Sequence, residues 1–419
     1  MRAASILLAL VLVSAPAWGQ AMPARADCYG SSASPEAMIA ACTALIAADT
    51  ASPSDQAKDY ANRAYGEHAR GQLDLAIADA GRAIRLRADY EFAYNIRGIA
   101  EGDKGLSDRA LADFSQAITL KHDYADALFN RGNRYSALGQ ADNAMLDRAV
   151  ADYTAAIEAD PKRGDALVNR GNAYRDQGQT DLALADYARA IELDAGDARA
   201  WYNRGKLENA LRRYDSALAD LNHAVALKAD MAVFYFERGF ANGELGHSDP
   251  AIVDFTKAIL IDPAFTGAYY RRGLHYRKLG QFDRAAADLT LVIARLPDDP
   301  YAYQIRGLVY RQQGLLDRAL ADLDRAVALK PDLVDAYVLR GTILGQRKAC
   351  ERAVSDFSHA IELQWDNAEA LAGRANCYVA TGMKDLAYAD YSRALEVNPA
   401  DRWSRSQLAR LEAEEQGAY

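Results

Sequence analysis

Residues 164–197 have the sequence GDALVNRGNAYRDQGQTDLALADYARAIELDAGD, in which Gln177-Gly178-Gln179 separates two amphipathic segments. Apolar residues recur every three or four positions in each segment, so each predicted helix carries one apolar stripe. Such a stripe is buried only when the helix packs on its partner or on a neighbouring copy of the pair. The stretch therefore predicts one helix-turn-helix unit of a stacked array.

The same pattern returns along the chain at intervals of 34 residues. A fixed period of this size is the sequence signature of a solenoid, in which each unit packs only on its neighbours. We predict ten units that together span 57–401, the third of them five residues longer than the others. Their ranges are 57–90, 91–124, 125–163, 164–197, 198–231, 232–265, 266–299, 300–333, 334–367 and 368–401.

The unit resembles the tetratricopeptide repeat. That family's pattern places a large apolar residue early in the first helix, Gly or Ala and then often Tyr after it, and Ala, a large residue and Ala in the second helix. In 164–197 these places hold Leu167, Gly171, Tyr174, Ala183, Tyr187 and Ala190. The resemblance implies an all-α, right-handed superhelical solenoid whose concave groove, lined by the first helices, holds polypeptide segments.

Two turns within the predicted units lack the glycine that usually stands there. The fifteenth place of the units is occupied by Arg212 in 198–231 and by Lys348 in 334–367. We expect these turns to be made without the conformational freedom of glycine.

The first 26 residues carry the features of a secretory signal peptide. Arg2 supplies a short positive region, residues 3–13 form an apolar run, and small residues suited to a cleavage site follow. The run is short for a bilayer span, and no later segment reaches a membrane-spanning length. We therefore expect residues 1–26 to direct export to the periplasm or exterior of a Gram-negative bacterium; an uncleaved membrane anchor is the alternative.

A predicted helix flanks the array at each end. Within 27–56, Ser34 is placed to cap an N-terminal helix with Pro35 in its first turn. We expect Ala37, Ala44 and Leu45 of this helix to face the first repeat. Within 402–419 a C-terminal helix and tail would cover the other open end of the array.

The four cysteines are Cys28, Cys42, Cys350 and Cys377, and an even number in an exported chain suggests disulfides. Distance along a stacked solenoid favours pairing Cys28 with Cys42 and Cys350 with Cys377. For the second pair, two buried free thiols are the alternative.

Two places are invariant among the ten units: the seventh is always Arg and the twenty-third is always Asp. Because a specific binding site would need its residues in only a few units, this repetition indicates architecture. We predict a ladder in which each carboxylate is held by the guanidinium of its own or of the next unit. Its central members are Arg170, Asp186, Arg204, Asp220, Arg238 and Asp254.

The resemblance also indicates which side chains line the groove. In the third to fifth units the corresponding places hold polar residues suited to bonding a peptide backbone, namely Asn133, Asn169, Asn172, Arg199, Asn203 and Lys206. From the fifth unit on they hold aromatic and basic residues, namely Tyr202, Phe236, Phe240, Tyr270, Tyr301, Arg271, Arg277, Lys278 and Arg311. Aromatics and Arg often anchor interfaces; packing between repeats is the alternative role for the aromatics.

The overall composition argues for a binding role and against several others. A net charge of −9 disfavours nucleic acid as the main partner. The chain has no metal-ligand spacing, phosphate loop or nucleophile motif, so we predict no catalytic residue, metal or cofactor. The sequence predicts a non-catalytic scaffold that binds a polypeptide with apolar and acidic residues. The alternative is a module that recognises a cell-envelope polysaccharide or another non-protein ligand.

Overall fold

The computed structural model describes residues 25–30, 32–49, 51–139 and 142–415. Within these ranges the secondary structure is helical, without a strand, and successive helices pack pairwise, which confirms the all-α solenoid of helix-turn-helix repeats. Residues 1–24, which make up almost all of the predicted signal peptide, lie outside the described residues. None of the described helices combines the length and the apolar character that crossing a bilayer requires.

The chain divides into two compact units, Met1–Leu207 and Glu208–Tyr419, called unit 1 and unit 2 below. Unit 1 contains α2 (Pro35–Ala48), α3 (Pro53–Ala69), α4 (Leu73–Leu86), α5 (Glu91–Asp103), α6 (Ser107–Leu120), α7 (Ala125–Leu138), α8 (Asn143–Ala159), α9 (Gly164–Asp176), α10 (Thr180–Leu193) and most of α11 (Ala198–Ala210).

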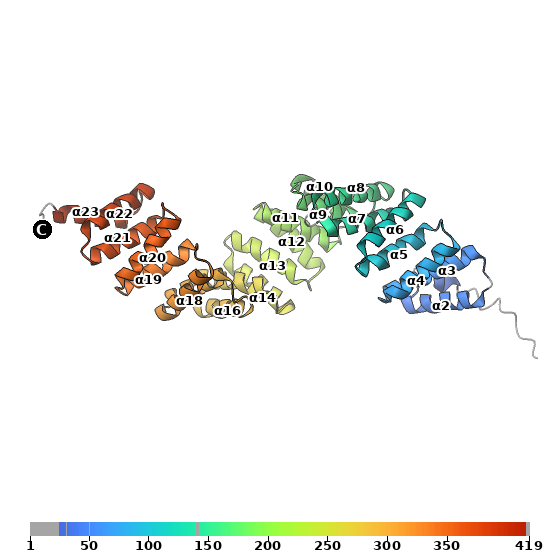
Figure 1. Cartoon of the computed structure of the whole chain (residues 1–419), viewed down its shortest axis with the longest axis horizontal. Coiled ribbons are helices and arrows are strands. Elements are labelled where there is room, and N and C mark those ends of the chain that lie inside the picture. Colours follow the sequence, from blue (N-terminus) through green and yellow to red (C-terminus); the bar gives the residue numbers. More distant parts are fainter. Residues whose placement is uncertain (1–24, 31, 50, 140–141, 416–419) are drawn as a thin grey trace, which may run out of the picture. The chain divides into compact units, whose positions relative to one another are not determined.

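Unit 2 contains the end of α11 and the twelve helices that follow it (Figure 1). These are α12 (Tyr214–Leu227), α13 (Ala232–Glu244), α14 (Ser248–Ile261), α15 (Thr266–Lys278), α16 (Phe282–Arg295), α17 (Pro300–Gln312), α18 (Leu316–Leu329), α19 (Val334–Gln346), α20 (Cys350–Leu363), α21 (Ala368–Ala380), α22 (Lys384–Val397) and α23 (Arg402–Glu415).

The packing of α9 on α10 shows how the apolar stripes are used. Leu167 on α9 and Tyr187 on α10 are both fully buried. Gly171 lets the two helices approach, because a Cβ at this position would lie 2.7 Å from Cε1 of Tyr187. The aromatic ring therefore fills the space that the missing side chain leaves, and the pair forms one layer of the core.

The turns inside the helix pairs use the left-handed backbone region. Gly178 between α9 and α10 has φ +75°. At the two turns without glycine, Arg212 has φ 59° and Lys348 has φ 62°. A residue with a Cβ is strained there, so these turns keep the geometry of the others at a cost in stability.

The invariant arginines and aspartates pair within the same repeat. In eight repeats the arginine Nε and Nη2 donate two parallel hydrogen bonds to one carboxylate, at 2.6–3.0 Å. The pairs are Arg97–Asp113, Arg131–Asp152, Arg170–Asp186, Arg238–Asp254, Arg272–Asp288, Arg306–Asp322, Arg340–Asp356 and Arg374–Asp390. Arg63 reaches Asp79 through Nε at 2.5 Å. Arg204 and Asp220 occupy the same two places, in unit 1 and unit 2 respectively.

In seven of these eight pairs, all except Arg97–Asp113, the third guanidinium nitrogen, Nη1, donates to a side chain of the preceding repeat. Nη1 of Arg170 donates to Thr154 on α8 at 3.0 Å, and Nη1 of Arg272 donates to Thr256 on α14 at 3.0 Å. Within each unit the ladder therefore joins neighbouring repeats as well as the two helices of a pair.

The N-terminal helix α2 packs on α3 through a face that differs from the predicted one. Its buried residues are Met38 and Cys42, whereas Ala37 and Ala44 are exposed. The predicted contact face was therefore wrong, because the buried positions are shifted by about one residue along the helix. The register of α2 is consistent with the Arg63 contact, in which Nη1 donates to Thr43 at 3.2 Å. Thr43 thus occupies the place that Thr154 has in the third repeat, and the preceding residue, Cys42, is buried.

The two predicted cysteine pairs differ in the structure. Cys28 and Cys42 are joined by a disulfide with a Cα–Cα distance of 4.9 Å. Cys350 and Cys377 are free thiols, so the bridge expected between them is not formed. Cys377, on α21, is buried in an apolar cluster with residues of α19, α20 and α22, and burial, followed by a hydrogen bond with Cys350, raises its pKa to about 12.

Candidate functional site

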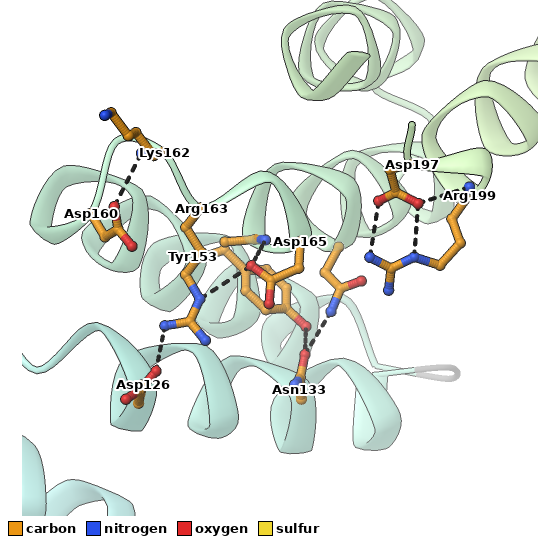
Figure 2. A network of polar contacts seen from close by, with 11 residues as sticks. Asp126, Asn133, Tyr153, Asp160, Lys162, Arg163, Asp165, Asp197 and Arg199 are labelled. Carbon is orange, nitrogen blue, oxygen red and sulfur yellow. Dashed lines mark hydrogen bonds and ion pairs between the residues drawn. The ribbon is translucent and has the colours of Figure 1, made fainter. Parts of the chain in front are cut away.

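Three of the predicted groove asparagines of unit 1, Asn133, Asn169 and Asn172, form hydrogen bonds with one another or with buried tyrosines, and Figure 2 shows those of Asn133. Oδ1 of Asn133 accepts hydrogen bonds from Tyr153 Oη and Asn169 Nδ2, both at 2.8 Å. Oδ1 of Asn172 accepts one from Tyr187 Oη at 2.8 Å. These carbonyl groups satisfy phenol hydroxyls that the core would otherwise leave unpaired. A role of these asparagines in peptide binding stays a prediction.

The other predicted groove residues of unit 1 lie on the first part of α11. Arg199 forms an ion pair with Asp197, Nη2 to Oδ2 at 2.9 Å, and its side chain is 62% exposed (Figure 2). Tyr202 and Asn203 are half-buried, and Lys206 is exposed.

Four of the predicted aromatic and basic residues of unit 2, namely Phe236, Tyr270, Arg271 and Tyr301, line an open pocket with a volume of about 340 Å³. Its apolar walls are Phe236, Tyr270, Val292, Leu296 and Tyr301. Its remaining lining is Thr266, Gly267, Arg271 and Asp299. We call this space the anchor pocket. It combines a mostly apolar wall with a few charged groups, as small binding sites commonly do.

Three consecutive first helices position the pocket's aromatic side chains: Phe236 on α13, Tyr270 on α15 and Tyr301 on α17. The ring of Phe236 is packed against Phe255 and Phe265, with centroid distances of 5.7 Å and 4.7 Å. This side of the pocket is therefore held by aromatic contacts of the fold. Tyr301 is 45% exposed, and it is held by Lys330, whose Nζ donates to the Tyr301 hydroxyl at 2.6 Å.

Gly267 leaves the space open at the start of α15. A Cβ at this position would be 3.6 Å from the ring of Phe236, which is ordinary van der Waals contact. A longer side chain would extend into the anchor pocket without displacing the backbone. The residue is thus a point where the pocket can be filled by substitution.

The pocket's two charged residues also have contacts within the fold. The guanidinium of Arg271 lies over the ring of Phe240 at 4.7 Å and is 3.8 Å from Glu244. Oδ1 of Asp299 accepts the backbone N–H of Tyr301 at 3.0 Å, which caps α17. These contacts fix the two opposite charges at the pocket.

Tyr270 lies among these charges. Its pKa is raised, first by burial and then by the carboxylate of Asp299, while Arg271 and Arg277 act in the opposite direction. Its hydroxyl is therefore a neutral hydrogen-bonding group at ordinary pH.

Three further cations lie at the ends of α15 and α17: Arg277, Lys278 and Arg311, called the basic cluster below. Among the described residues none of the three forms an ion pair, and Nε of Arg277 is buried without a hydrogen-bond partner. Cations at these ends also interact favourably with the helix dipoles. Beyond that role, their charge is available to an acidic ligand.

The sequence identified part of the pocket and missed the rest. Phe236, Tyr270, Arg271 and Tyr301 were predicted and line it, whereas Phe240 contacts Arg271 and the basic cluster lies farther along α15 and α17. Val292 and Leu296 were missed because they belong to α16 and its C-terminal end, outside the first helices. Gly267 has in 266–299 the place that Arg199, a predicted groove residue, has in 198–231, and a glycine at that place was the signal that could have identified it.

A larger, open depression of about 830 Å³ lies elsewhere in unit 2. It is lined by residues 280–284 at the start of α16 and by Gln313 and Leu315 in the turn before α18. Asp283 already accepts a hydrogen bond from Gln313 Nε2 at 2.7 Å. Fewer large apolar side chains line it, so the smaller anchor pocket is the better candidate.

The described residues contain no group of three or more His, Cys, Asp or Glu side chains placed to hold a metal ion. Chemically, the anchor pocket offers an apolar surface, a hydroxyl and fixed charges. Groups of this kind bind a ligand through apolar contacts, hydrogen bonds and ion pairs.

Family models for tetratricopeptide repeats match several parts of the chain. A model described as TPR repeat matches residues 171–211. Models described as tetratricopeptide repeat match 152–185, 198–231, 232–265, 270–334 and 368–401. Among curated proteins, none matches the sequence.

Solved structures with a similar fold include YrrB, a TPR protein with an unusual peptide-binding site, at 24% identity over 44% of this chain and 95% of that one, with a TM-score of 0.42. A tetratricopeptide repeat protein from Parabacteroides merdae is 23% identical over 60% of this chain and 98% of that one, with a TM-score of 0.43. A chain of the APC/C hetero-tetramer Cut9–Hcn1 is 13% identical over 90% of this chain and 93% of that one, with a TM-score of 0.47.

Proposed function

Because the chain belongs to the tetratricopeptide repeat family, we propose that it is a protein–protein interaction scaffold whose unit 2 binds an extended polypeptide segment at the anchor pocket. The observation that carries the proposal is the convergence of aromatic side chains from α13, α15 and α17 on one apolar space. Large amphipathic rings that already have fixed positions lose little entropy on binding, which makes them effective anchors.

The charge distribution supports a partner with acidic residues. The chain as a whole has a net charge of −9, yet the face of α15 that carries Tyr270 also carries Arg271, Arg277 and Lys278. A local positive surface on an acidic protein attracts acidic segments and repels basic ones. We therefore propose a partner segment with apolar and acidic residues, and no nucleic acid.

The proposed role is non-catalytic, with no cofactor. The residues that the sequence singles out for the site are aromatic, amide and basic side chains, without a nucleophile and base within one motif. We also propose the division of 57–401 into ten repeats as the frame that presents the site.

We propose in addition that the chain is exported. The motif in residues 1–26 supports this, and so does the disulfide between Cys28 and Cys42, because such bonds persist in oxidising compartments. Fusion of residues 1–26 to a reporter enzyme that is active only after export tests the proposal. A fusion without activity outside the cytoplasm contradicts it.

Filling the pocket tests the binding proposal directly. Gly267→Leu places a side chain in the anchor pocket while improving the helix propensity of α15. The matched control is Gly164→Leu at the start of α9, where an added Cβ meets nothing within 4 Å. Losing the burial of one large apolar side chain costs about 1.5–3 kcal/mol, so affinity for the partner should fall about ten- to hundredfold.

The measurement is affinity capture from an extract of the exported proteins with each of the three forms, followed by titration of the retained protein. Retention by the unaltered chain and by Gly164→Leu, with loss in Gly267→Leu, supports the proposal. If all three forms retain the partner protein equally, the binding site lies outside the anchor pocket and the proposal is wrong. Retention of polysaccharide, lost in Gly267→Leu, instead supports recognition of an envelope glycan.

A further inference from the structure

The anchor pocket and the basic cluster share one face of α15. Tyr270 and Arg277 are seven residues apart, and so are Arg271 and Lys278, which is two helical turns in each case. At 1.5 Å per residue the two levels are separated by about 10 Å, or about 16 Å from Gly267 to Lys278. The half-buried Leu274 lies between them on this face.

An extended chain covers the same distance in a few residues. At about 3.3 Å per residue, 10–16 Å corresponds to about three to five residues. One short segment can therefore reach both features if it runs along α15.

The charges along this path favour carboxylates at its far end. Arg277 and Lys278 close α15, and Arg311 occupies the corresponding place on α17 in the next repeat. Nε of Arg277 is buried without a hydrogen-bond partner, and among the described residues no carboxylate pairs with this guanidinium, so its positive charge can attract a carboxylate of a ligand. The neighbouring His275 has a lowered pKa, through burial and then through Lys278 and Arg271, and is therefore neutral at ordinary pH.

From these distances and charges we infer that the partner segment runs along α15, with a large apolar side chain in the anchor pocket and carboxylates at the basic cluster about three to five residues away. The inference rests on the proposed function and adds to it a spacing rule. The segment is defined by the distance between its anchor and its acidic residues.

Selection from a random peptide library tests the rule without knowledge of the natural partner. Peptides of about a dozen residues are long enough to cover α15 in an extended conformation. The library is selected on the full chain and, in parallel, on Gly267→Leu. Enriched sequences that share a large apolar residue and an acidic residue three to five positions away are the expected result.

Charge reversal on both sides provides the second measurement. Arg277→Glu combined with Lys278→Glu should weaken an enriched acidic peptide about five- to twentyfold at low salt, since each exposed ion pair contributes up to about fivefold. The same variant should bind better than the unaltered chain to the peptide whose acidic residues are replaced by Lys. The matched control is Arg175→Glu, at the corresponding position of α9, where the arginine already pairs with Asp176.

The outcomes separate the two proposals. If no peptide is enriched on the unaltered chain relative to Gly267→Leu, the proposed function itself fails. If peptides are enriched but lack acidic residues at this spacing, the inferred path along α15 is wrong. The same holds if Arg175→Glu weakens binding as much as the double reversal does. In both cases the proposed binding at the anchor pocket still stands.

Discussion

Arg238 and Asp254 are joined by two parallel hydrogen bonds, Nε to Oδ2 at 3.0 Å and Nη2 to Oδ1 at 2.6 Å. The carboxylate belongs to a residue that is 3% exposed, whereas the arginine side chain is 23% exposed. The same guanidinium donates from Nη1 to Asn222 on α12 at 3.0 Å. One arginine thus connects three successive helices and neutralises a buried charge.

Replacing Arg238 should therefore destabilise unit 2. Arg238→Ala leaves the buried Asp254 without its counter-charge, and breaking a buried pair costs about 3–5 kcal/mol. We expect about 3 kcal/mol, since the arginine is partly exposed, and a melting temperature lower by roughly 6–10 °C. Thermal and urea unfolding followed by circular dichroism measure the change.

The control for this prediction is Arg325→Ala. Arg325 pairs with Asp298 at 3.3 Å, but the two side chains are 48% and 82% exposed, so the loss should stay below about 1 kcal/mol. Equal melting temperatures for the two variants would contradict the importance of burial in the ladder.

Glu67 should make the stability of the first repeat depend on pH. Burial raises its pKa from 4.5 to about 7; Asp79 adds to this, while Arg63 and Arg82 oppose it. Its Oε2 is buried without a hydrogen-bond partner. Because the folded state holds this proton more tightly than the unfolded state does, stability rises as pH falls from about 7 to about 4.5.

Glu67→Gln removes this dependence. The variant should be more stable than the unaltered chain at pH values above about 7, and the difference should disappear toward about 4.5. Hydrogen exchange of α3 and α4 at several pH values measures it. Glu101→Gln, in the next repeat, should act in the same direction, since burial raises the pKa of Glu101 as well. A Glu67→Gln variant that is less stable above neutral pH would refute the assignment.

Lys348→Gly should stabilise the chain. Lys348 has φ 62°, a conformation that costs a residue with a Cβ about 1–2 kcal/mol. Glycine avoids this strain but gives the unfolded chain more freedom, which offsets about 0.4–1 kcal/mol. We expect a net gain of about 0.5–1 kcal/mol in urea unfolding. The reverse substitution, Gly314→Lys at φ +77°, should cause a loss of similar size; a gain there would contradict the argument.

Removing the disulfide should loosen the N-terminal helix and leave the rest of the array unchanged. The bond between Cys28 and Cys42 closes a loop with a sequence separation of 14, for which the chain-entropy model gives about 3 kcal/mol. Cys28→Ser with Cys42→Ser should increase proteolysis and hydrogen exchange in 25–48, where Tyr29 Oη donates to Asp59 at 2.5 Å. Equal protection of 25–48 in both forms would contradict this prediction.

The sequence predicted the fold well because the deciding signals are local. Leu167, Gly171 and Tyr187 carry the helical period and the small-to-large packing of one helix pair, and their places recur in the other repeats. The candidate site was predicted only in part. Its first-helix members, Phe236 and Tyr270, follow from the repeat pattern, but the contribution of Leu296 depends on how the end of α16 packs against the next repeat.

By itself the sequence determined the helix-turn-helix array, the positions of the invariant arginines and aspartates, and the turns without glycine, since each depends on residues within one period. The tertiary structure decided which side chains remain available for binding. Asn133 is engaged by Tyr153, whereas Gly267 opens a pocket beside Phe236. It also decided that Cys42 faces inward and bonds to Cys28. These features depend on distances between segments that are far apart in the chain, and only the packed helices fix such distances.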